Sequence, residues 1–261
     1  MYVTGIDIGS VASKIVILDE ERDVINYVVM PALPSEESAS TVFSKALEDK
    51  SLSRKDVAYI VATGYGRVNV PFANKMYTEI LCHAMGINYL LPSVRTVIDI
   101  GGQDSKAIKI SNYGRVENFI MNDKCAAGTG RFLEVMQGVL GVEFSKWGDL
   151  VAKAKSTASI SSVCTVFAES EVISKVTQKV PLEEIIAGVC ESIAIRVSQL
   201  AKRLPIERDV CLTGGVAYNK GVVQKLGESL GVELLVAEIP QSTGALGAAL
   251  MALRNYKALK N

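Results

Sequence analysis

The chain carries one motif twice, as Thr4-Gly-Ile-Asp-Ile-Gly-Ser-Val-Ala-Ser-Lys14 and, 92 positions later, as Thr96-Val-Ile-Asp-Ile-Gly-Gly-Gln-Asp-Ser-Lys106. Thr, Ile, Asp, Ile, Gly, Ser and Lys recur in register. In each copy an apolar strand turns at glycine into a second strand, and a polar turn leads to a third. The second and third strands are expected at 15–18 and 24–30 in the first copy, and at 107–110 and 116–121 in the second. A duplicated three-stranded unit predicts two similar domains.

The segments outside the repeat alternate between helical and strand patterns. Helices are expected near 39–47, 76–85, 129–140, 165–178, 182–203 and 221–230, strands at 57–62, 210–212 and 232–236, and a last helix from about Thr243. Pro92 breaks the chain between the two copies. We therefore predict an α/β fold of two domains, residues 1–94 and 95–244, with a C-terminal helix at 245–261 that packs back onto the first domain.

The charge and hydropathy patterns exclude two classes of partner. The 28 Lys and Arg residues balance the 28 Asp and Glu residues without a basic stripe, and nucleic acid phosphates require clustered positive charge. No apolar run approaches the roughly 20 residues that cross a bilayer. The first residues, Met1 to Asp7, read as a strand and not as a signal peptide. We expect a cytoplasmic protein with neither nucleic acid nor membrane as a partner.

Asp7 and Asp99 each stand at the end of a strand, two residues before a glycine of the turn. Such a glycine lets backbone N–H groups close around phosphate oxygens. A carboxylate repels phosphate, so the two aspartates would hold Mg²⁺ or its waters. Ordinary solvent-facing turns are the alternative, but the duplication of both Asp and Lys favours phosphate binding. The residues expected to contact nucleotide here are Gly9, Ser10, Val11, Ala12, Ser13, Lys14, Gly101, Gly102 and Gln103.

A third glycine site, Thr213-Gly-Gly-Val-Ala-Tyr-Asn219, follows a predicted strand. Gly214 and Gly215 would let a flat ring lie against the backbone, which suits the adenosine end of a nucleotide. Asn219 and Gln241 are expected near the adenine or the ribose. Gln241 could equally cap the last helix.

The five cysteines contain no C-x-x-C pair, and a disulfide framework is improbable for this chain. Cys82, Cys190 and Cys211 lie inside predicted helices or strands and are expected to be core residues. Cys125 and Cys164 each precede an amphipathic helix, whose N-terminus stabilises a thiolate and could donate to cluster sulfurs. A four-iron cluster needs four thiolates, which two copies around a twofold axis would supply. The residues alone leave inert buried thiols as an open alternative.

Together these motifs resemble the actin-like ATPase superfamily and, more narrowly, the activator family of 2-hydroxyacyl-CoA dehydratases and benzoyl-CoA reductases. The blocks that carry the resemblance are Ala62 to Arg67, Val97 to Asp104, Met121 to Leu133, Ser162 to Glu171, Thr213 to Val216 and Gly244 to Ala249. They run through nearly the whole chain, and the two that hold cysteines are highly specific. The resemblance implies two actin-like (ribonuclease H-like) domains with mixed sheets and an interdomain nucleotide cleft.

The resemblance also implies a function. Members are homodimeric ATPases with one [4Fe–4S] cluster between the subunits, which assigns Cys125 and Cys164 as its ligands. Asp7 and Asp99 would serve Mg²⁺, and Gln103 would orient the attacking water. The protein would then be an ATP-dependent, low-potential electron donor of an anaerobe. It would receive electrons from ferredoxin or flavodoxin and pass them to an iron–sulfur enzyme such as a 2-hydroxyacyl-CoA dehydratase.

Four alternatives stay open. The acceptor could be a related protein with an unusual iron–sulfur cluster, or the chain could be the ATPase subunit of a benzoyl-CoA reductase-type complex. A small-molecule kinase of the same fold would have no use for Cys125 and Cys164, and a non-catalytic nucleotide sensor of actin type is the remaining alternative. The iron content of anoxically purified protein would separate the last two from the leading hypothesis.

Overall fold

The computed structural model describes residues 1–33 and 37–260. They divide into two units, and each unit contains a five-stranded mixed sheet within the described residues. Unit 1 consists of Met1–Val94, Ile110–Glu117 and the chain from Ala237 onward, whereas unit 2 consists of Arg95–Lys109 and Asn118–Val236.

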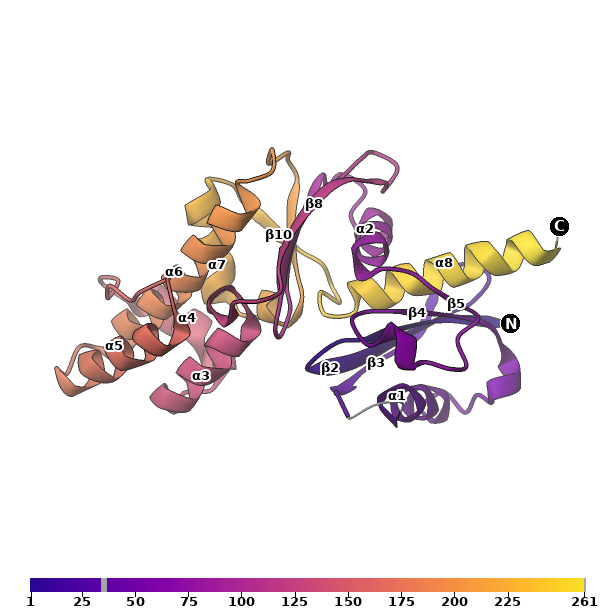
Figure 1. Ribbon diagram of the computed structural model, residues 1–261, viewed down its shortest axis with the longest axis horizontal. Coiled ribbons are helices and arrows are strands. Elements are labelled where there is room, and N and C mark those ends of the chain that lie inside the picture. The colour runs from indigo at the N-terminus through magenta and orange to yellow at the C-terminus, as the bar shows by residue number, and fades with distance from the viewer. Residues whose placement is uncertain (34–36, 261) are drawn as a thin grey trace. The chain divides into compact units, whose positions relative to one another are not determined.

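The sheet of unit 1 has the strand order β3-β2-β1-β4-β5. Its strands are β1 (Tyr2–Ile8), β2 (Ala12–Leu18), β3 (Val24–Pro31), β4 (Val57–Thr63) and β5 (Lys75–Met76). The central strand β1 runs antiparallel to β2 and parallel to β4. One face is covered by α1 (Glu37–Glu48), and the other by α8 (Thr243–Lys260), on which α2 (Glu79–Leu90) packs (Figure 1).

Both faces of β1 are buried, because its successive side chains point alternately to the two helix-covered faces of the sheet. Ile6 and Ile8 pack into the cluster under α1, whereas Val3 packs into the cluster under α8. The α8 cluster is rich in alanine, which lets the helix lie close to the strand. Burial on both faces makes β1 a nearly continuous apolar run, and Asp7 is the charged residue that interrupts it near its end.

The sheet of unit 2 repeats the same order as β10-β9-β6-β7-β8. Its strands are β6 (Thr96–Ile100), β7 (Ser105–Ile110), β8 (Val116–Asn122), β9 (Val210–Thr213) and β10 (Leu234–Val236). As in unit 1, the central strand β6 is antiparallel to the following strand and parallel to β9. The matching pairings confirm the predicted fold class of two similar mixed sheets.

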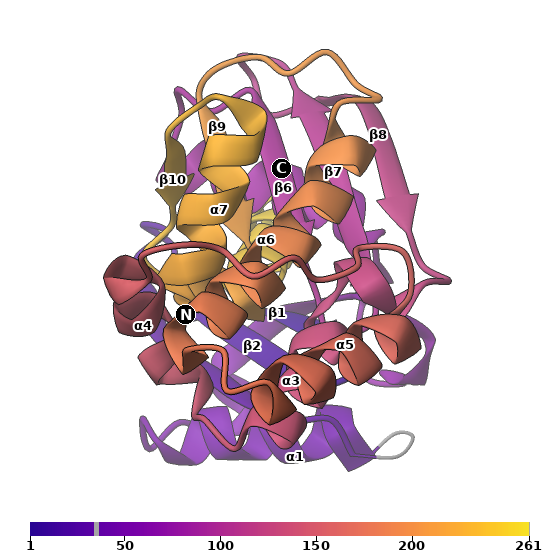
Figure 2. The ribbon, with the colours of Figure 1, turned by 90° about the vertical axis from the view of Figure 1, so that its left-hand side faces the viewer.

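Helices cover one face of the second sheet, with α6 and α7 lying across its strands (Figure 2). The helices of this unit are α3 (Gly130–Leu140), α4 (Trp147–Lys153), α5 (Thr165–Thr177), α6 (Leu182–Ala201) and α7 (Lys220–Leu230). Phe132 and Trp147 are fully buried among them and anchor α3 and α4 to the core. Together these helices position the two segments that carry Cys125 and Cys164.

Three local predictions differ from the structure. The helix expected from residue 76 begins at Glu79, because Met76 lies in β5 and pairs with Ala62. The strand expected from 232 begins at Leu234, because the N–H of Val232 still closes the end of α7. The short helix α4 was not predicted. Among the described residues, no helix combines the length and the apolar character that a membrane crossing needs.

Candidate functional site

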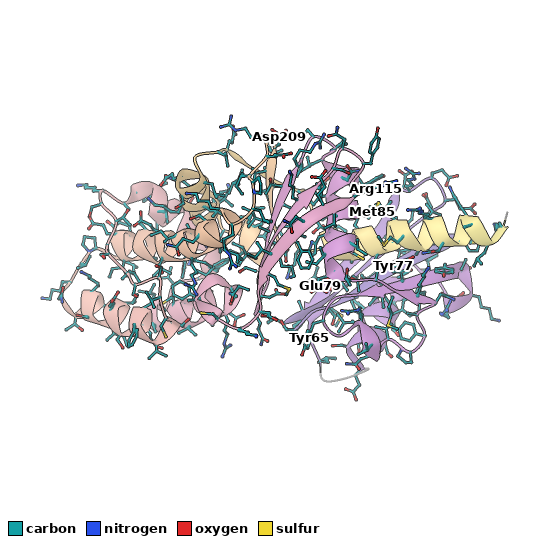
Figure 3. All side chains as sticks on the ribbon, turned by 45° about the horizontal axis from the view of Figure 1, so that its top comes forward. Tyr65, Tyr77, Glu79, Met85, Arg115 and Asp209 are labelled. Atoms are coloured by element: carbon teal, nitrogen blue, oxygen red, sulfur yellow. The ribbon has the colours of Figure 1, made fainter. Side chains whose placement is uncertain are left out.

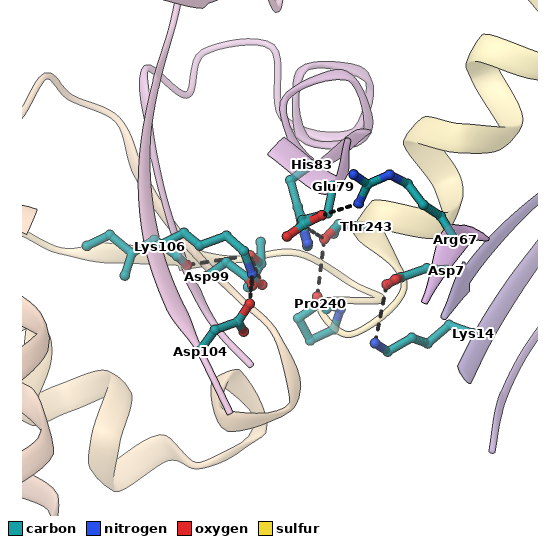
Figure 4. A network of polar contacts seen from close by, with 12 residues as sticks. Asp7, Lys14, Arg67, Glu79, His83, Asp99, Asp104, Lys106, Pro240 and Thr243 are labelled. Carbon is teal, nitrogen blue, oxygen red and sulfur yellow. Dashed lines mark hydrogen bonds and ion pairs between the residues drawn. The ribbon is translucent and has the colours of Figure 1, made fainter. Parts of the chain in front are cut away.

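The first predicted phosphate turn lies between β1 and β2 of unit 1. Asp7 is 5% exposed, and its Oδ2 lies 3.2 Å from Nζ of Lys14, the residue opposite it in β2 (Figure 4). The N–H of Gly9 donates to the carbonyl of Ala12 at 3.0 Å and closes the turn. The ammonium group of Lys14 offsets the carboxylate, so this end of the sheet carries a balanced charge pair beside an exposed loop.

The predicted contact residues of this turn differ in accessibility. Ser10 and Val11 form its exposed tip, and Gly9 and Ala12 are half-buried. Ser13 is 1% exposed inside β2, and its Oγ makes no hydrogen bond to the rest of the described chain. The structure therefore presents the tip of the turn to solvent and encloses Ser13.

The second turn, in unit 2, has the same charge pair with additional contacts. Oδ2 of Asp99 lies 3.3 Å from Nζ of Lys106, and Oδ1 accepts a hydrogen bond from Oγ1 of Thr213 at 2.8 Å. Lys106 also pairs with Asp104 at 2.6 Å (Figure 4). Thr213 was not predicted as part of this site, although its place at the end of a strand beside a glycine pair was a usable signal.

The backbone of the second turn is closed in the same way as the first. The N–H of Gly101 donates to the carbonyl of Asp104 at 2.9 Å. Gly101 and Gly102 are half-buried, and Gln103 is exposed at the tip. The N–H groups of Gly130 and Arg131 donate to the carbonyls of Gly101 and Gly102, each at 2.8 Å. The turn is therefore bonded to the first residues of α3.

A glycine with positive φ lies beside each aspartate. Gly64 follows β4 with φ 86°, and Gly214 follows β9 with φ 87°. A Cβ atom on Gly64 would lie 2.3 Å from Oδ1 of Asp7, and one on Gly214 would lie 3.1 Å from Oδ1 of Asp99. Only glycine combines this backbone conformation with this proximity. Gly214, which the sequence assigned to the adenosine end, thus also packs against the strand end that carries Asp99.

The two residues expected near the adenine belong to different units. Asn219 lies in unit 2 and is 2% exposed. Its side chain caps α7 by accepting from the N–H of Val222 at 3.0 Å, and it donates to the carbonyl of Phe144 at 3.3 Å. Gln241 lies in unit 1, just before α8. The side chain of Asn219 therefore has a clear structural role, and Gly215 begins the 3₁₀ turn that precedes it.

Three of the five cysteines are core residues, as predicted. Cys82, Cys190 and Cys211 have no exposed surface. Burial raises the pKa of both Cys82 and Cys190 to about 12, so these thiols stay protonated at neutral pH. Cys125 and Cys164 are half-buried, and both lie in unit 2. Cys125 precedes the 3₁₀ turn Ala126–Gly128 that leads into α3, and Cys164 is the N-cap residue of α5.

Side chains that were not predicted as site residues hold the backbone of both cysteine segments. Nδ2 of Asn122 donates to the carbonyl of Cys125 at 2.8 Å, and its Oδ1 accepts from the N–H of Cys125 at 3.2 Å. Near Cys164, Oε2 of Glu171 accepts from the N–H of Ser161 at 2.6 Å, while the hydroxyl of Ser192 donates to the Ser161 carbonyl at 2.8 Å. Both segments are therefore fixed by side chain to backbone hydrogen bonds.

The donor set fits half of an iron–sulfur cluster. Within the described residues no group of three or more His, Cys, Asp or Glu side chains could hold a metal ion. The chain does present two half-buried thiols, Cys125 at the beginning of the 3₁₀ turn before α3 and Cys164 at the N-terminus of α5. Because a four-iron cluster takes four thiolates, Cys125 and Cys164 fit such a group when two copies share it.

Comparison with known proteins places this geometry in a family. The chain is 50% identical over 252 residues to the activator of lactoyl-CoA dehydratase from Anaerotignum propionicum, covering 97% of each. It is 32% identical over 266 residues to one of the subunits of benzoyl-CoA reductase from Thauera aromatica, covering 98% of this chain and 94% of that one. The solved activator of 2-hydroxyisocaproyl-CoA dehydratase from Clostridium difficile, with bound ADPNP, superposes with a TM-score of 0.96 at 46% identity, covering 100% and 97% of the two chains.

The model of the BadF/BadG/BcrA/BcrD ATPase family matches residues 4–252, which include both predicted phosphate turns and both half-buried cysteines. The predicted resemblance to the dehydratase activators, and with it the actin-like ATPase fold, is confirmed. The chain belongs to the BadF/BadG/BcrA/BcrD ATPase family.

Proposed function

We propose that this chain is the ATP-dependent activator of a 2-hydroxyacyl-CoA dehydratase, and that it passes single low-potential electrons to that enzyme. The observation that carries the proposal is the pair of half-buried cysteines in a chain of this ATPase family, Cys125 before the 3₁₀ turn that leads into α3 and Cys164 at the N-terminus of α5. The relative with 50% identity is named as an activator of such a dehydratase.

The two cysteines would hold one [4Fe–4S] cluster together with the same residues of a second copy. Bound there, the cluster would supply a one-electron carrier. The chain's contribution is to fix the backbone of both cysteine segments, through Asn122 at Cys125 and through Glu171 at the segment before Cys164.

The surface beside Cys164 supports a homodimer. Helix α5 exposes an apolar stripe at helical spacing, and the residue before Cys164 extends it. Its members, with their exposed fractions, are Val163 68%, Val166 65%, Phe167 63%, Ile173 50% and Val176 49%. Exposed apolar side chains gathered along one helix favour an interaction site there. A twofold axis near it would bring the two pairs of cysteines together.

Hydrolysis of ATP would depend on positioning and electrostatics. Asp7 and Asp99 would bind Mg²⁺ through its waters, and Lys14 would offset phosphate charge. The tips Ser10–Val11 and Gly102–Gln103 would present backbone N–H groups to phosphate oxygens, and Gln103 would orient the attacking water. The exposure of both tips and the buried charge pairs behind them support these roles.

A second candidate is the ATPase subunit of a benzoyl-CoA reductase-type complex, which the reductase relative at 32% identity favours. The higher identity to a dehydratase activator, at matching chain length, favours the free homodimer. In either case we propose an anaerobic, cytoplasmic setting, with ferredoxin or flavodoxin as the upstream donor.

The test is anoxic purification followed by iron analysis and an activation assay. About two iron atoms per chain are expected, half of a four-iron cluster, together with ATP-dependent activation of lactoyl-CoA dehydratase or a similar dehydratase under a low-potential reductant. Cys125→Ser or Cys164→Ser should remove iron and activation, whereas Cys211→Ser should keep both. Four iron atoms per chain, or full iron after either of the first two substitutions, would contradict the proposed cluster.

A further inference from the structure

Two main-chain hydrogen bonds, together called the joint below, connect the second phosphate turn to α3, the helix that follows Cys125. The first N–H groups of an α-helix have no partner within the helix and need another acceptor. The side chain of Thr129, the N-cap residue of α3, does not act as such an acceptor. Instead the N–H groups of Gly130 and Arg131 donate to the carbonyls of Gly101 and Gly102, each at 2.8 Å. The phosphate turn is itself the cap of α3.

The contact leaves little room for a side chain at position 130, so a Cβ atom there would push the turn and the helix apart by a few tenths of an ångström. A Cβ atom on Gly130 would lie 3.0 Å from the carbonyl oxygen of Gly101 and 3.3 Å from Cα of Gly102. It would also lie 3.6 Å from Val216, in the loop after β9. Glycine at position 130 therefore lets the turn and the helix meet through their main chains.

On its other side the joint continues to the cysteine. Both the N–H and the hydroxyl of Thr129 bond to the carbonyl of Ala126, at 3.0 and 2.9 Å, which closes the 3₁₀ turn between Cys125 and α3. Asn122 then holds the N–H and the carbonyl of Cys125. Every step from the phosphate turn to Cys125 is thus a short covalent link or a hydrogen bond of the main chain.

Peptide geometry gives this connection a mechanism. The carbonyl of Gly101 and the N–H of Gly102 belong to one planar group, as do the carbonyl of Gly102 and the N–H of Gln103. A phosphate bound by these N–H groups would pull on the same two peptide planes whose carbonyls cap α3. Nucleotide bound at the turn would therefore act directly on the cap of α3.

We propose that the Gly101–Gly130 and Gly102–Arg131 hydrogen bonds transmit the nucleotide state of the phosphate turn to the Cys125 end of the cluster site. The inference rests on the proposed function, since it takes the turn as a phosphate site and Cys125 as a cluster ligand. The residues that would couple the turn to Cys125 are the partners of these two hydrogen bonds. Gly130 is a positioning residue that acts on Cys125 through the main chain.

The experiment compares nucleotide responses in two variants of one helix. The rate at which a chelator removes iron from the anoxic holoprotein is measured with and without Mg²⁺–ADPNP, together with the electron paramagnetic resonance spectrum of the reduced cluster. In the wild type, ADPNP should change the rate by about fivefold, at the lower end of typical couplings between sites. In Gly130→Ala the ratio of rates should approach one, and the spectrum should lose its response to ADPNP. Gly138→Ala is the matched control, because nothing lies within 4 Å of a Cβ atom at that position of α3.

A second variant covers the possibility that Gly130→Ala fails to fold. Thr129→Val keeps the shape of the side chain and removes the hydroxyl bond to Ala126, so it should also weaken the response. A wild-type response in a folded Gly130→Ala protein, or in Thr129→Val if the first variant is insoluble, would overturn the inference and leave the proposed function standing. Wild-type protein without iron, or without ATP-dependent activation, would overturn both.

Discussion

The side-chain amide of Asn122 binds both main-chain polar groups of Cys125, donating to its carbonyl at 2.8 Å and accepting from its N–H at 3.2 Å. With both main-chain groups held, the direction of the thiol is set by rotation about its single Cα–Cβ bond. Asn122 is therefore expected to orient the thiol of Cys125, the proposed cluster ligand, without binding the cluster itself.

The substitution Asn122→Ala should weaken iron retention while the protein remains folded. Loss of the two bonds costs about 2 kcal/mol, at roughly 1 kcal/mol each, and it frees the Cys125 segment. We expect the holoprotein to lose iron to a chelator several times faster than the wild type. Asn118→Ala is the matched control, because this exposed amide of the same strand bonds only its neighbour Phe119 in the described contacts. Equal rates in the Asn122 variant and the wild type would contradict the role.

Replacing Asp7 or Asp99 by Ala should abolish Mg²⁺-dependent hydrolysis without unfolding the protein. A loss of about 100-fold or more is expected, as for removal of one preorganised electrostatic group. The fold should survive, because Lys106 keeps Asp104 as a partner at 2.6 Å and the Lys14 side chain retains 14% exposure. Phosphate release and thermal unfolding are measured together. Asp49→Ala, a surface aspartate paired with Lys45, is the control. Unchanged turnover in both site variants would remove the aspartates from the mechanism.

At pH 8 iodoacetamide should modify Cys125 and Cys164 in the iron-free protein and spare Cys82 and Cys190. The spared thiols are fully buried, and burial raises the pKa of each to about 12. Peptide mapping by mass spectrometry gives the modified positions, and the same reaction in urea is the control in which all thiols react. Rapid modification of Cys82 in the native protein would show that its packing is not as described.

The buried thiols of Cys82 and Cys190 also predict how the free energy of unfolding changes at high pH. The unfolded thiols titrate near their ordinary pKa of 9.0, whereas the folded thiols keep their protons until about pH 12. The unfolded state therefore binds fewer protons in this window, and the free energy of unfolding decreases as pH rises above 9. Below pH 9 these thiols contribute no pH dependence. In a Cys82→Ala, Cys190→Ala double variant, urea denaturation should show a shallower alkaline decline.

A charge placed in the apolar stripe of α5 should dissociate the proposed dimer. Phe167 is 63% exposed, so Phe167→Glu leaves the fold of the single chain intact but buries an unpaired charge at the interface. Sedimentation should report a monomer, and the iron content should fall with it. Tyr113→Glu, at a position that is 81% exposed in unit 1, should stay dimeric. A dimeric Phe167→Glu protein would move the interface elsewhere.

Much of the fold was predictable because the repeat encodes it locally. The short apolar runs of β1, β2, β6 and β7 are a local pattern, and the repeat at constant offset gave both sheets the same order. The errors arose where distant pairing overrides local pattern. Met76 continues a helical spacing, yet its pairing with Ala62 places it in β5.

Those parts of the candidate site could be predicted that follow from the sequence repeat or from the type of residue. The Asp–Lys pairs and the two helix-preceding cysteines could be seen in this way. Thr213 was missed despite its place at a strand end beside a glycine pair, because its bond to Asp99 joins residues 114 positions apart. Gly130 was visible only as one glycine in a glycine-rich segment, since its contact with Gly101 depends on how the chain returns after β8. Residue type alone did not indicate exposure either: Tyr65, in the loop after β4, is 86% exposed (Figure 3), whereas Ser13 is enclosed in β2.

The position of α8 in the chain has a consequence for biosynthesis. Its alanine-rich face covers Val3, Val16 and Val61, yet α8 leaves the ribosome more than 220 residues after β1. Domains generally fold as units during synthesis, and the segments of unit 2 are complete by Val236. Unit 2 is therefore expected to mature first, while the uncovered face of β1 remains a target for chaperones until the last helix emerges.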